Sequence, residues 1–210
     1  MSGLASGEPS DAVLLRQHAD GDPEAFGLLF ERHSGRLWAV ALRITCDPDD
    51  AADALQEAMI SAFRRAADFR AESAVTTWLH RIVVNASLDL LRRRRPQAVG
   101  WSGDPDELPA GEFQPAHDSA AAVDSRLDVD AALRMLPPPQ RAALVLVDML
   151  GYSVADAAAI LGISEGTVKS RCARGRTRLL PYVAHLRAGY PGSGNQTVTD
   201  GVPSEQGGGG

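Results

Sequence analysis

The chain is poor in cysteine and in long apolar runs, and each shortage excludes a class of protein. Its 210 residues include two cysteines, Cys46 and Cys172, which form no C-x-x-C pair. Neither a disulfide scaffold nor a cysteine zinc site is therefore expected. No stretch approaches the roughly 18 apolar residues of a membrane span, and the N-terminus lacks a basic segment followed by an apolar run. We expect no membrane insertion and a cytoplasmic protein.

An excess of positive charge is also missing. The formal net charge of −6 argues against a protein that coats nucleic acid without selectivity, because such proteins neutralise many phosphates at once. Basic residues are concentrated in two places, the four arginines of residues 92–95 and the segment 165–178, where five basic residues face one acidic residue. Both places are candidate phosphate contacts, although most charge runs are solvated helix faces.

Helical periodicity without a strand pattern dominates residues 11–95 and predicts four helices. The first covers residues 11–19, the third about 49–66, and the fourth runs from residue 73 or 74 into the arginine run. Gly21-Asp22-Pro23 and Asp47-Pro48 mark breaks. The second helix is expected to bury Phe26, Leu29, Phe30, Leu37, Val40 and Ala41. The third should turn inward Leu55, Ala58, Met59, Ala62 and Phe63, and the fourth Trp78, Leu79, Ile82, Val83, Ala86 and Leu90.

Residues 96–125 differ in kind, with four prolines, three glycines, six acidic residues and no lysine or arginine. This composition predicts a flexible acidic linker. Helical patterning resumes at residue 126, and the prolines of residues 137–139 should start a helix through Leu150. The fold class is therefore all-α, with two small helical domains at 11–95 and 126–187. The glycine-rich tail, 188–210, should be disordered.

Residues 152–176 predict a helix-turn-helix. Ser153 can cap a short alanine-rich helix, Gly162 supplies the turn, and Ser164 can cap the second helix. Val168 lies ten residues after Ala158, a spacing that lets one helix pack across the other. The exposed face carries side chains that suit a major-groove reader, namely Thr167, Lys169, Ser170, Arg171, Arg174 and Arg176. A plain packing unit is the alternative, and Cys172 is interpreted as a packing residue in preference to a redox switch.

Two helices of the first domain carry further candidate surfaces. Asp53, Gln56, Glu57 and Ile60 lie opposite the apolar stripe of the third helix and suit docking onto another helical surface, although a solvated face has the same pattern. The fourth helix offers aromatic, amide and basic groups near a loop, a mixture useful for single-stranded DNA, in Trp78, His80, Arg81, Asn85 and Asp89. Trp78 taken alone is more typical of a core residue.

Five fragments, in this order, resemble the extracytoplasmic-function sigma factors. They are Gly-Asp-Pro-Glu-Ala-Phe (21–26), Asp-Ala-Leu-Gln-Glu-Ala (53–58), Phe-Arg-Ala-Glu-Ser-Ala (69–74), Thr-Trp-Leu-His-Arg-Ile-Val-Val-Asn (77–85) and Gly-Thr-Val-Lys-Ser-Arg (166–171). Within that group the chain is similar to the sigma M type of actinobacteria. The resemblance implies a transcription initiation factor that is not an enzyme and that uses no metal or cofactor. Its implied partners are core RNA polymerase, promoter DNA in duplex and melted form, and an anti-sigma factor, and it implies a stress regulon.

The resemblance also implies roles for individual residues. The segment that grips the clamp helices of the largest polymerase subunit corresponds to Asp53, Ala54, Leu55, Gln56, Glu57 and Ile60. Melted minus-10 DNA would be held by Phe69, Arg70, Ala71, Glu72, Ser73, Trp78, Arg81 and Asn85, and the minus-35 duplex by the basic face of residues 165–178. The loop has Arg70-Ala71-Glu72 where many relatives carry Arg-Gly-Asp, which leaves its base preference open.

Two other classes of function compete with this interpretation. A stand-alone helix-turn-helix repressor or activator would not need the face around Asp53 and Gln56. A nucleic-acid enzyme such as a nuclease would need clustered carboxylates or histidines, and the five histidines of the chain are scattered.

Overall fold

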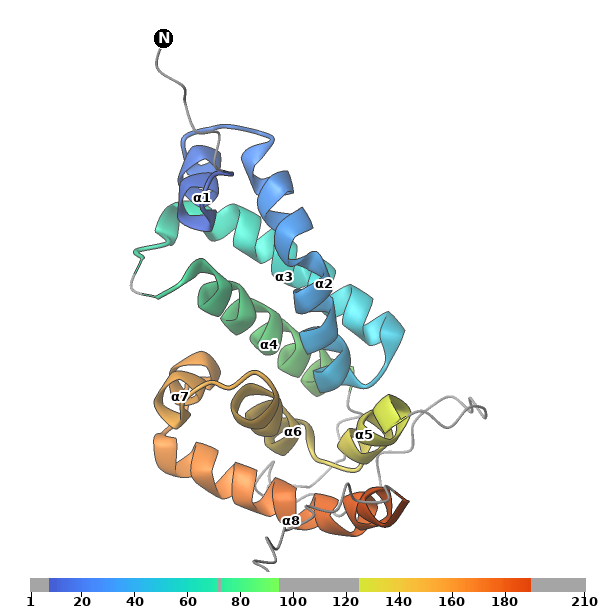
Figure 1. The fold of residues 1–210 in the computed structure, drawn as a ribbon. Helices are drawn as coiled ribbons and strands as arrows, with labels where there is room; N and C mark the ends of the chain where they lie inside the picture. Colours follow the sequence, from blue (N-terminus) through green and yellow to red (C-terminus); the bar gives the residue numbers. More distant parts are fainter. Residues whose placement is uncertain (1–7, 72, 95–124, 190–210) are drawn as a thin grey trace, which may run out of the picture.

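The computed structural model describes residues 8–71, 73–94 and 125–189, and all regular structure in these ranges is helical. Helices α1 to α4 form one body, and α5 to α8 form a second body packed against it (Figure 1). The predicted all-α class is confirmed. The predicted linker up to residue 124, the tail beyond residue 189, and Glu72 and Arg95 lie outside the described residues.

Helix α1, Asp11–Ala19, has the bounds that the sequence predicts. It begins after Ser10, whose Oγ accepts a hydrogen bond from the amide of Val13 at 3.4 Å. Its first residue is also the anchor to α2, since the two carboxylate oxygens of Asp11 bind Arg32 at 2.6 Å and His33 at 2.8 Å. Although burial alone would raise the pKa of Asp11, these two partners hold it below its usual range.

Helices α2, Ala25–Thr45, and α3, Pro48–Arg65, meet at the predicted break. Cys46 ends α2 in the left-handed conformation, with φ of 60°. Asp47 then accepts hydrogen bonds from two amides of the first turn of α3, each at 2.9 Å, and Pro48 occupies a position where no amide donor is needed. Local chemistry therefore sets this corner.

The contact of α3 with α2 and α4, Val75–Arg94, depends on alanine. The apolar side chains that α3 buries are Ala51, Ala54, Ala58 and Ala62. Because these side chains are small, the neighbouring helices approach closely, and the larger side chains of the predicted stripe remain at its margins. Leu55 and Met59 are half-buried.

The prediction that Phe63 and Phe30 point inward is wrong, since they are 51% and 37% exposed. The buried alanines of α3 form a narrower face than the apolar stripe predicted from the sequence, so Phe63 lies at the edge of the helix contact. There its ring lies against those of His18 and Phe26, with centroids 4.3 and 5.2 Å away. In α4, Trp78 and Ala86 are half-buried, whereas the four other predicted residues are buried.

The second body contains α5, Ser125–Arg134, and α6, Pro138–Leu144, followed by a π-helical turn, Val145–Met149. The predicted helix through Leu150 is therefore present, but its winding changes near the end. The amide of Leu150 binds the carbonyl of Val145 at 2.9 Å, five residues back.

The predicted helix-turn-helix is confirmed in α7, Val154–Leu161, and α8, Glu165–Gly189. Gly162 ends α7 with φ of 66°, a conformation that favours glycine. Ser153 caps α7, and Ser164 accepts a hydrogen bond from the amide of Thr167 at 3.2 Å at the start of α8. Val168 is fully buried. Helix α8 continues past the basic segment 165–178 and includes Pro181.

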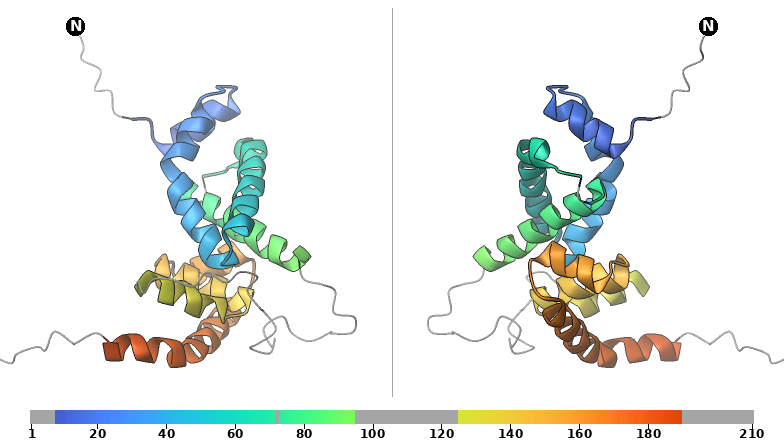
Figure 2. Two further views of the ribbon diagram at one scale, coloured as in Figure 1. Left: turned by 90° about the vertical axis from the view of Figure 1, so that its right-hand side faces the viewer. Right: turned by 90° about the vertical axis from the view of Figure 1, so that its left-hand side faces the viewer.

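The two bodies share one continuous core, which the sequence did not predict. Helices α6 and α7 lie between α8 and the first body (Figure 2). The buried guanidinium of Arg141 on α6 donates hydrogen bonds to the carbonyl of Ile44, at the end of α2, and to that of Leu136. The hydroxyl of Tyr152 lies 2.7 Å from Nδ1 of His80 on α4. These contacts hold the two domains together in a closed arrangement.

Candidate nucleic-acid and partner interfaces

The proposed docking face on α3 is polar and exposed. Its exposed members are Asp53, Gln56, Glu57 and Ile60, and Ile60 is 45% exposed. Ala54 is fully buried and Leu55 is half-buried, so these two residues of the segment take part in helix packing.

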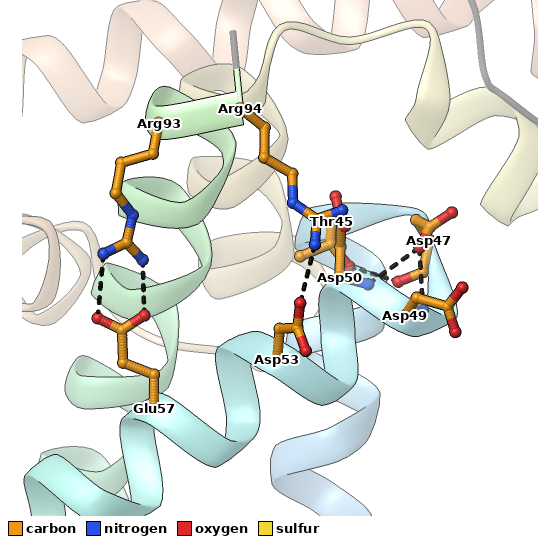
Figure 3. A network of polar contacts seen from close by, with 8 residues as sticks. All are labelled: Thr45, Asp47, Asp49, Asp50, Asp53, Glu57, Arg93 and Arg94. Carbon is orange, nitrogen blue, oxygen red and sulfur yellow. Dashed lines mark hydrogen bonds and ion pairs between the residues drawn. The ribbon is translucent and has the colours of Figure 1, made fainter.

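The carboxylates of this face are bound by the arginines at the end of α4 (Figure 3). Arg93 donates two hydrogen bonds to Glu57, at 2.6 and 3.4 Å, and Arg94 donates to Asp53 at 2.8 Å and to Asp50. The hydrogen bonds from Arg93 to Glu57 raise the pKa of Arg93. Within the predicted phosphate contact, the described arginines at 92–94 are therefore already engaged with carboxylates in this structure.

Asp50 differs from the other two carboxylates because its side chain is only 11% exposed. Burial raises the pKa of Asp50, and the charges of Asp47 and Asp53 add to this effect, while Arg94 opposes it. A partly buried carboxylate of this kind needs its cation, so Asp50 anchors the end of α4 to the start of α3.

A polar groove of about 320 Å³ runs between α3 and α4. Three residues that the sequence analysis assigned to melted DNA, Trp78, Arg81 and Asn85, line it together. The other lining residues are Glu57, Ser61, Arg65, Ile82, Ala86 and Asp89. The groove thus combines an aromatic ring, an amide and two guanidiniums, which can stack on a base, read its edge and bind a phosphate.

The loop before α4 lies beside this groove through one aromatic contact. The rings of Phe69 and Trp78 meet edge to face, with centroids 5.5 Å apart. Arg70, Ala71 and Ser73 are exposed, and Ala71 has φ of +56°, in the region that glycine favours. Ala71 therefore adopts a glycine-like backbone conformation.

The side chain of Asn85 is half-buried in the groove wall. A purely structural role for Asn85, in which its amide ties down the backbone, predicts a hydrogen bond to a neighbouring main-chain group. The structure shows none for this side chain within the described ranges, which leaves the amide available to a ligand.

The basic face of α8 divides into two parts. Thr167, Ser170, Arg171 and Arg174 recur at the three- and four-residue spacing of one helix face, and Lys169 pairs with Glu165 at 3.6 Å. Arg176 instead binds both carboxylate oxygens of Asp148, at 2.6 and 3.0 Å, beside the π-helical turn. In this structure Arg176 therefore holds α8 against the preceding helix.

The structure adds Ser61 and Arg65 to the groove, and the sequence analysis missed them, whereas Asp89 lines the groove together with the residues it was predicted with. A signal for Ser61 and Arg65 exists, because Glu57, Ser61 and Arg65 are four residues apart on α3. Which faces of two helices meet could not be read from that spacing alone.

The two cysteines lie in packed surroundings. Cys172 is 3% exposed, and Cys46 is half-buried near the domain contact. Burial raises the pKa of both thiols, which lowers the fraction of reactive thiolate. This environment supports the interpretation of Cys172 as a packing residue.

Membrane-spanning helices and clusters of metal-binding side chains are absent from the described ranges. No helix there combines the length and the apolar character needed to cross a membrane. No three His, Cys, Asp or Glu side chains in those ranges are grouped so that they could hold a metal ion.

Comparison with known proteins assigns both halves of the chain. Residues 29–97 match the family model Sigma-70 region 2, and residues 126–179 match Sigma-70, region 4. The ECF RNA polymerase sigma factor SigM of Mycobacterium tuberculosis is 48% identical over 182 residues, covering 87% of this chain and 89% of that protein. The ECF RNA polymerase sigma-E factor of Escherichia coli is 33% identical, covering 80% and 91%.

Solved structures with the same fold include CnrH in complex with the cytosolic domain of CnrY, at 29% identity and a TM-score of 0.58, covering 87% of this chain and 100% of CnrH. Another is the sigma factor RpoE in complex with the anti-sigma factor NepR from Bartonella quintana, at 27% identity and a TM-score of 0.58, covering 77% and 98%. Together with the two family models and the 48% identity to SigM, these likenesses show that the chain belongs to the ECF family of RNA polymerase sigma factors.

Proposed function

We propose that the two domains of this sigma factor divide promoter recognition between them. The first, 11–95, binds core polymerase through α3 and holds melted minus-10 DNA in the groove between α3 and α4. The second, 126–187, reads the minus-35 duplex with α8. The observation that carries this proposal is the convergence of Trp78, Arg81 and Asn85 on one polar groove.

The groove suits an unpaired base better than a duplex. Trp78 offers a stacking surface, and the Asn85 amide offers a donor and an acceptor to a base edge that pairing would otherwise occupy. The loop residues Phe69, Arg70, Ala71, Glu72 and Ser73 are proposed to form the adjoining wall. Stacking of a base on an aromatic ring contributes about 1 to 3 kcal/mol.

Helix α8 is proposed to enter the major groove of the minus-35 element. Arg171 and Arg174 share a face with Thr167 and Ser170, and arginine pairs bidentately with guanine. Lys169 is proposed to contact phosphate. Arg176, which binds Asp148, is proposed to support the orientation of the helix.

The closed arrangement must open for both elements to be contacted. Minus 35 and minus 10 are about 25 base pairs apart by their numbering, or about 85 Å of duplex. A compact body of about 150 residues has a radius of gyration of about 15 Å and a diameter of about 40 Å. Opening would break the contacts of Arg141 with Ile44 and of Tyr152 with His80. The 30 residues between 94 and 125 could reach at most about 100 Å.

The same proposal includes three further points: regulation by an anti-sigma factor, control of a stress regulon and action in the cytoplasm. The supporting observation is that CnrH was solved with the cytosolic domain of CnrY and RpoE with the anti-sigma factor NepR. An anti-sigma factor of this chain is proposed to cover the polymerase and DNA surfaces described above.

The polymerase part of the proposal is tested with mycobacterial core RNA polymerase. Substituting Asp53 and Gln56 together by alanine should weaken binding in a competition assay, because both side chains are exposed on the docking face. Circular dichroism should show unchanged helix content. Unchanged affinity for core polymerase would contradict the assignment of this face.

The DNA part is tested with Asn85→Ala on premelted promoters that carry base substitutions at each minus-10 position. The variant should lose discrimination at one position while its thermal stability and minus-35 binding persist. Equal discrimination by variant and wild type at every position would contradict the groove assignment.

A further inference from the structure

The end of α4 and the docking face of α3 are joined by an exposed network of ion pairs (Figure 3). Arg93 binds Glu57 through its two terminal guanidinium nitrogens, Nη1 and Nη2, and Arg94 bridges Asp53 and Asp50. The side chains of Arg93, Arg94, Asp53 and Glu57 are each 50 to 56% exposed. Both arginines and these two carboxylates are thus accessible to a binding partner.

This network lies where the two proposed binding surfaces of the first domain meet. Asp53 and Glu57 are one helical turn apart on the docking face, and Glu57 also lines the groove. Asp89, one turn before Arg93 on α4, lines the same groove and binds Arg92 at 2.8 Å. A change in the partners of Glu57 therefore affects both the docking face and the end of the groove.

We propose that the pairs Arg93–Glu57 and Arg94–Asp53 form a lock that couples polymerase binding to DNA binding. In the free protein the two arginines are held by carboxylates and are withheld from nucleic acid. When basic groups of the polymerase bind Glu57 and Asp53, the arginines are released and bind phosphates of the strand that occupies the groove. This inference rests on the proposed function of the two surfaces.

The local charge supports this coupling. In the network the guanidiniums of Arg92, Arg93 and Arg94 face the carboxylates of Asp50, Asp53, Glu57 and Asp89, which leaves a balance of −1 that disfavours phosphate. Masking of Asp53 and Glu57 by a basic partner changes the balance to +1, and the end of the groove then attracts a nucleic-acid backbone.

The strength of the contacts fits a reversible exchange. Exposed ion pairs contribute little to folding, so a partner can replace them at low cost. The partly buried Asp50 keeps Nη1 of Arg94 and preserves the join between the helices, while Nη2 of Arg94, which binds Asp53, is the group that is released. On the scale of exposed pairs, each released arginine should change an affinity about twofold to fivefold.

The test measures binding of the free, full-length protein to a fluorescein-labelled single-stranded minus-10 oligonucleotide. Glu57→Gln keeps the shape of the side chain and removes its charge. We expect it to raise affinity about twofold to fivefold and to steepen the dependence of log affinity on log salt by about 0.7, the value for one additional phosphate contact on a single strand.

The matched control is Glu31→Gln, which removes the same charge from an exposed position of the same domain, outside the groove lining and the network. It should change neither affinity nor salt dependence appreciably. Adding Arg93→Ala to Glu57→Gln should return both to the wild-type values, because the released cation is then absent. Equal effects of Glu57→Gln and Glu31→Gln, or a gain that persists without Arg93, would overturn the lock.

A second measurement separates failure of the lock from failure of the proposed function. Arg93→Ala leaves Glu57 free, so it should tighten binding to core polymerase about twofold to fivefold. If the Asp53/Gln56 double variant weakens core binding but Arg93→Ala leaves it unchanged, the docking face stands and the lock is wrong. If neither the double variant nor Arg93→Ala changes the affinity for core polymerase, the docking assignment itself fails.

Discussion

The guanidinium of Arg141, on α6, donates a hydrogen bond of 2.5 Å to the carbonyl of Ile44, at the end of α2. Arg141 is fully buried, and burial lowers its pKa, because an ion away from water is disfavoured. A second bond, to the carbonyl of Leu136 at 2.8 Å, stays within its own domain. One cation thus satisfies carbonyls of both domains at the centre of the closed arrangement.

Replacing Arg141 should loosen this arrangement. Arg141→Ala removes both hydrogen bonds and leaves a cavity, so we expect a loss of about 3 kcal/mol or more in the free energy of unfolding. Arg141→Met keeps most of the volume and should cost less. Urea denaturation measures the stability, and small-angle X-ray scattering should show a larger radius of gyration for both variants. An unchanged radius would contradict a clasp between the domains.

His80 should make the closed form sensitive to acid. Burial, followed by the charges of Arg36 and His33, lowers the pKa of His80 from 6.5 to about 4. Between pH 6.5 and about 4 the unfolded chain binds the proton and the folded protein does not, so stability falls as the pH falls through this window. The loss is at most about 3 kcal/mol.

Urea unfolding between pH 4.5 and 7.5 measures this effect with two variants. His80→Leu should make the free energy of unfolding less dependent on pH. Tyr152→Phe removes the hydroxyl that meets Nδ1 of His80 but keeps the imidazole covered, so it should retain the slope while lowering stability. If the free energy of unfolding falls equally steeply with falling pH in His80→Leu and in the wild type, groups other than His80 cause the pH dependence.

Gly175 should be intolerant of any side chain, in contrast to Gly166 on the same helix. A Cβ at Gly175 would lie 2.7 Å from Cδ1 of the buried Leu144, whereas a Cβ at Gly166 would meet only Ser164 Oγ at 3.8 Å. Alanine has a higher helix propensity than glycine at both positions. We therefore expect Gly175→Ala to be less stable than Gly166→Ala by about 1 to 3 kcal/mol, measured by chemical denaturation. Equal stabilities would show that Leu144 moves aside freely.

The arginines of α8 should separate into a base reader and a support. Arg171→Ala should cost about 1 to 3 kcal/mol on the specific minus-35 site and relax the preference at one position, whereas loss of a phosphate contact would weaken all sequences alike. Binding to a library of minus-35 duplexes distinguishes the two outcomes. A uniform loss across the library would refute base readout by Arg171.

Arg176 should behave as the support, because it is bound to Asp148. Arg176→Ala and Asp148→Asn should each lower the free energy of unfolding by less than about 1 kcal/mol, measured by thermal denaturation. The double variant should be as stable as either single variant, because one interaction is lost in all three. Additive losses in this cycle would indicate that the two side chains act independently.

The sequence by itself determined the helices and most of their ends. Ser153 and Ser164 cap their helices as predicted, Asp47 lies at a predicted break, and Gly162 lies at the predicted turn. These signals act within about four residues along the chain, so they depend little on the rest of the fold. The helix-turn-helix could be predicted for the same reason.

The tertiary structure decided which side chains meet across the helices. The alanines of α3 narrowed its buried face and left Phe63 outside, and the approach of α3 to α4 brought Glu57 to Arg93, 36 positions later in the chain. The same approach formed the groove and gave it Ser61 and Arg65. The closed contact through Arg141 joins residues 97 positions apart. No local pattern encodes such pairs, because they depend on helix separation and rotation, which the packing of the whole core sets.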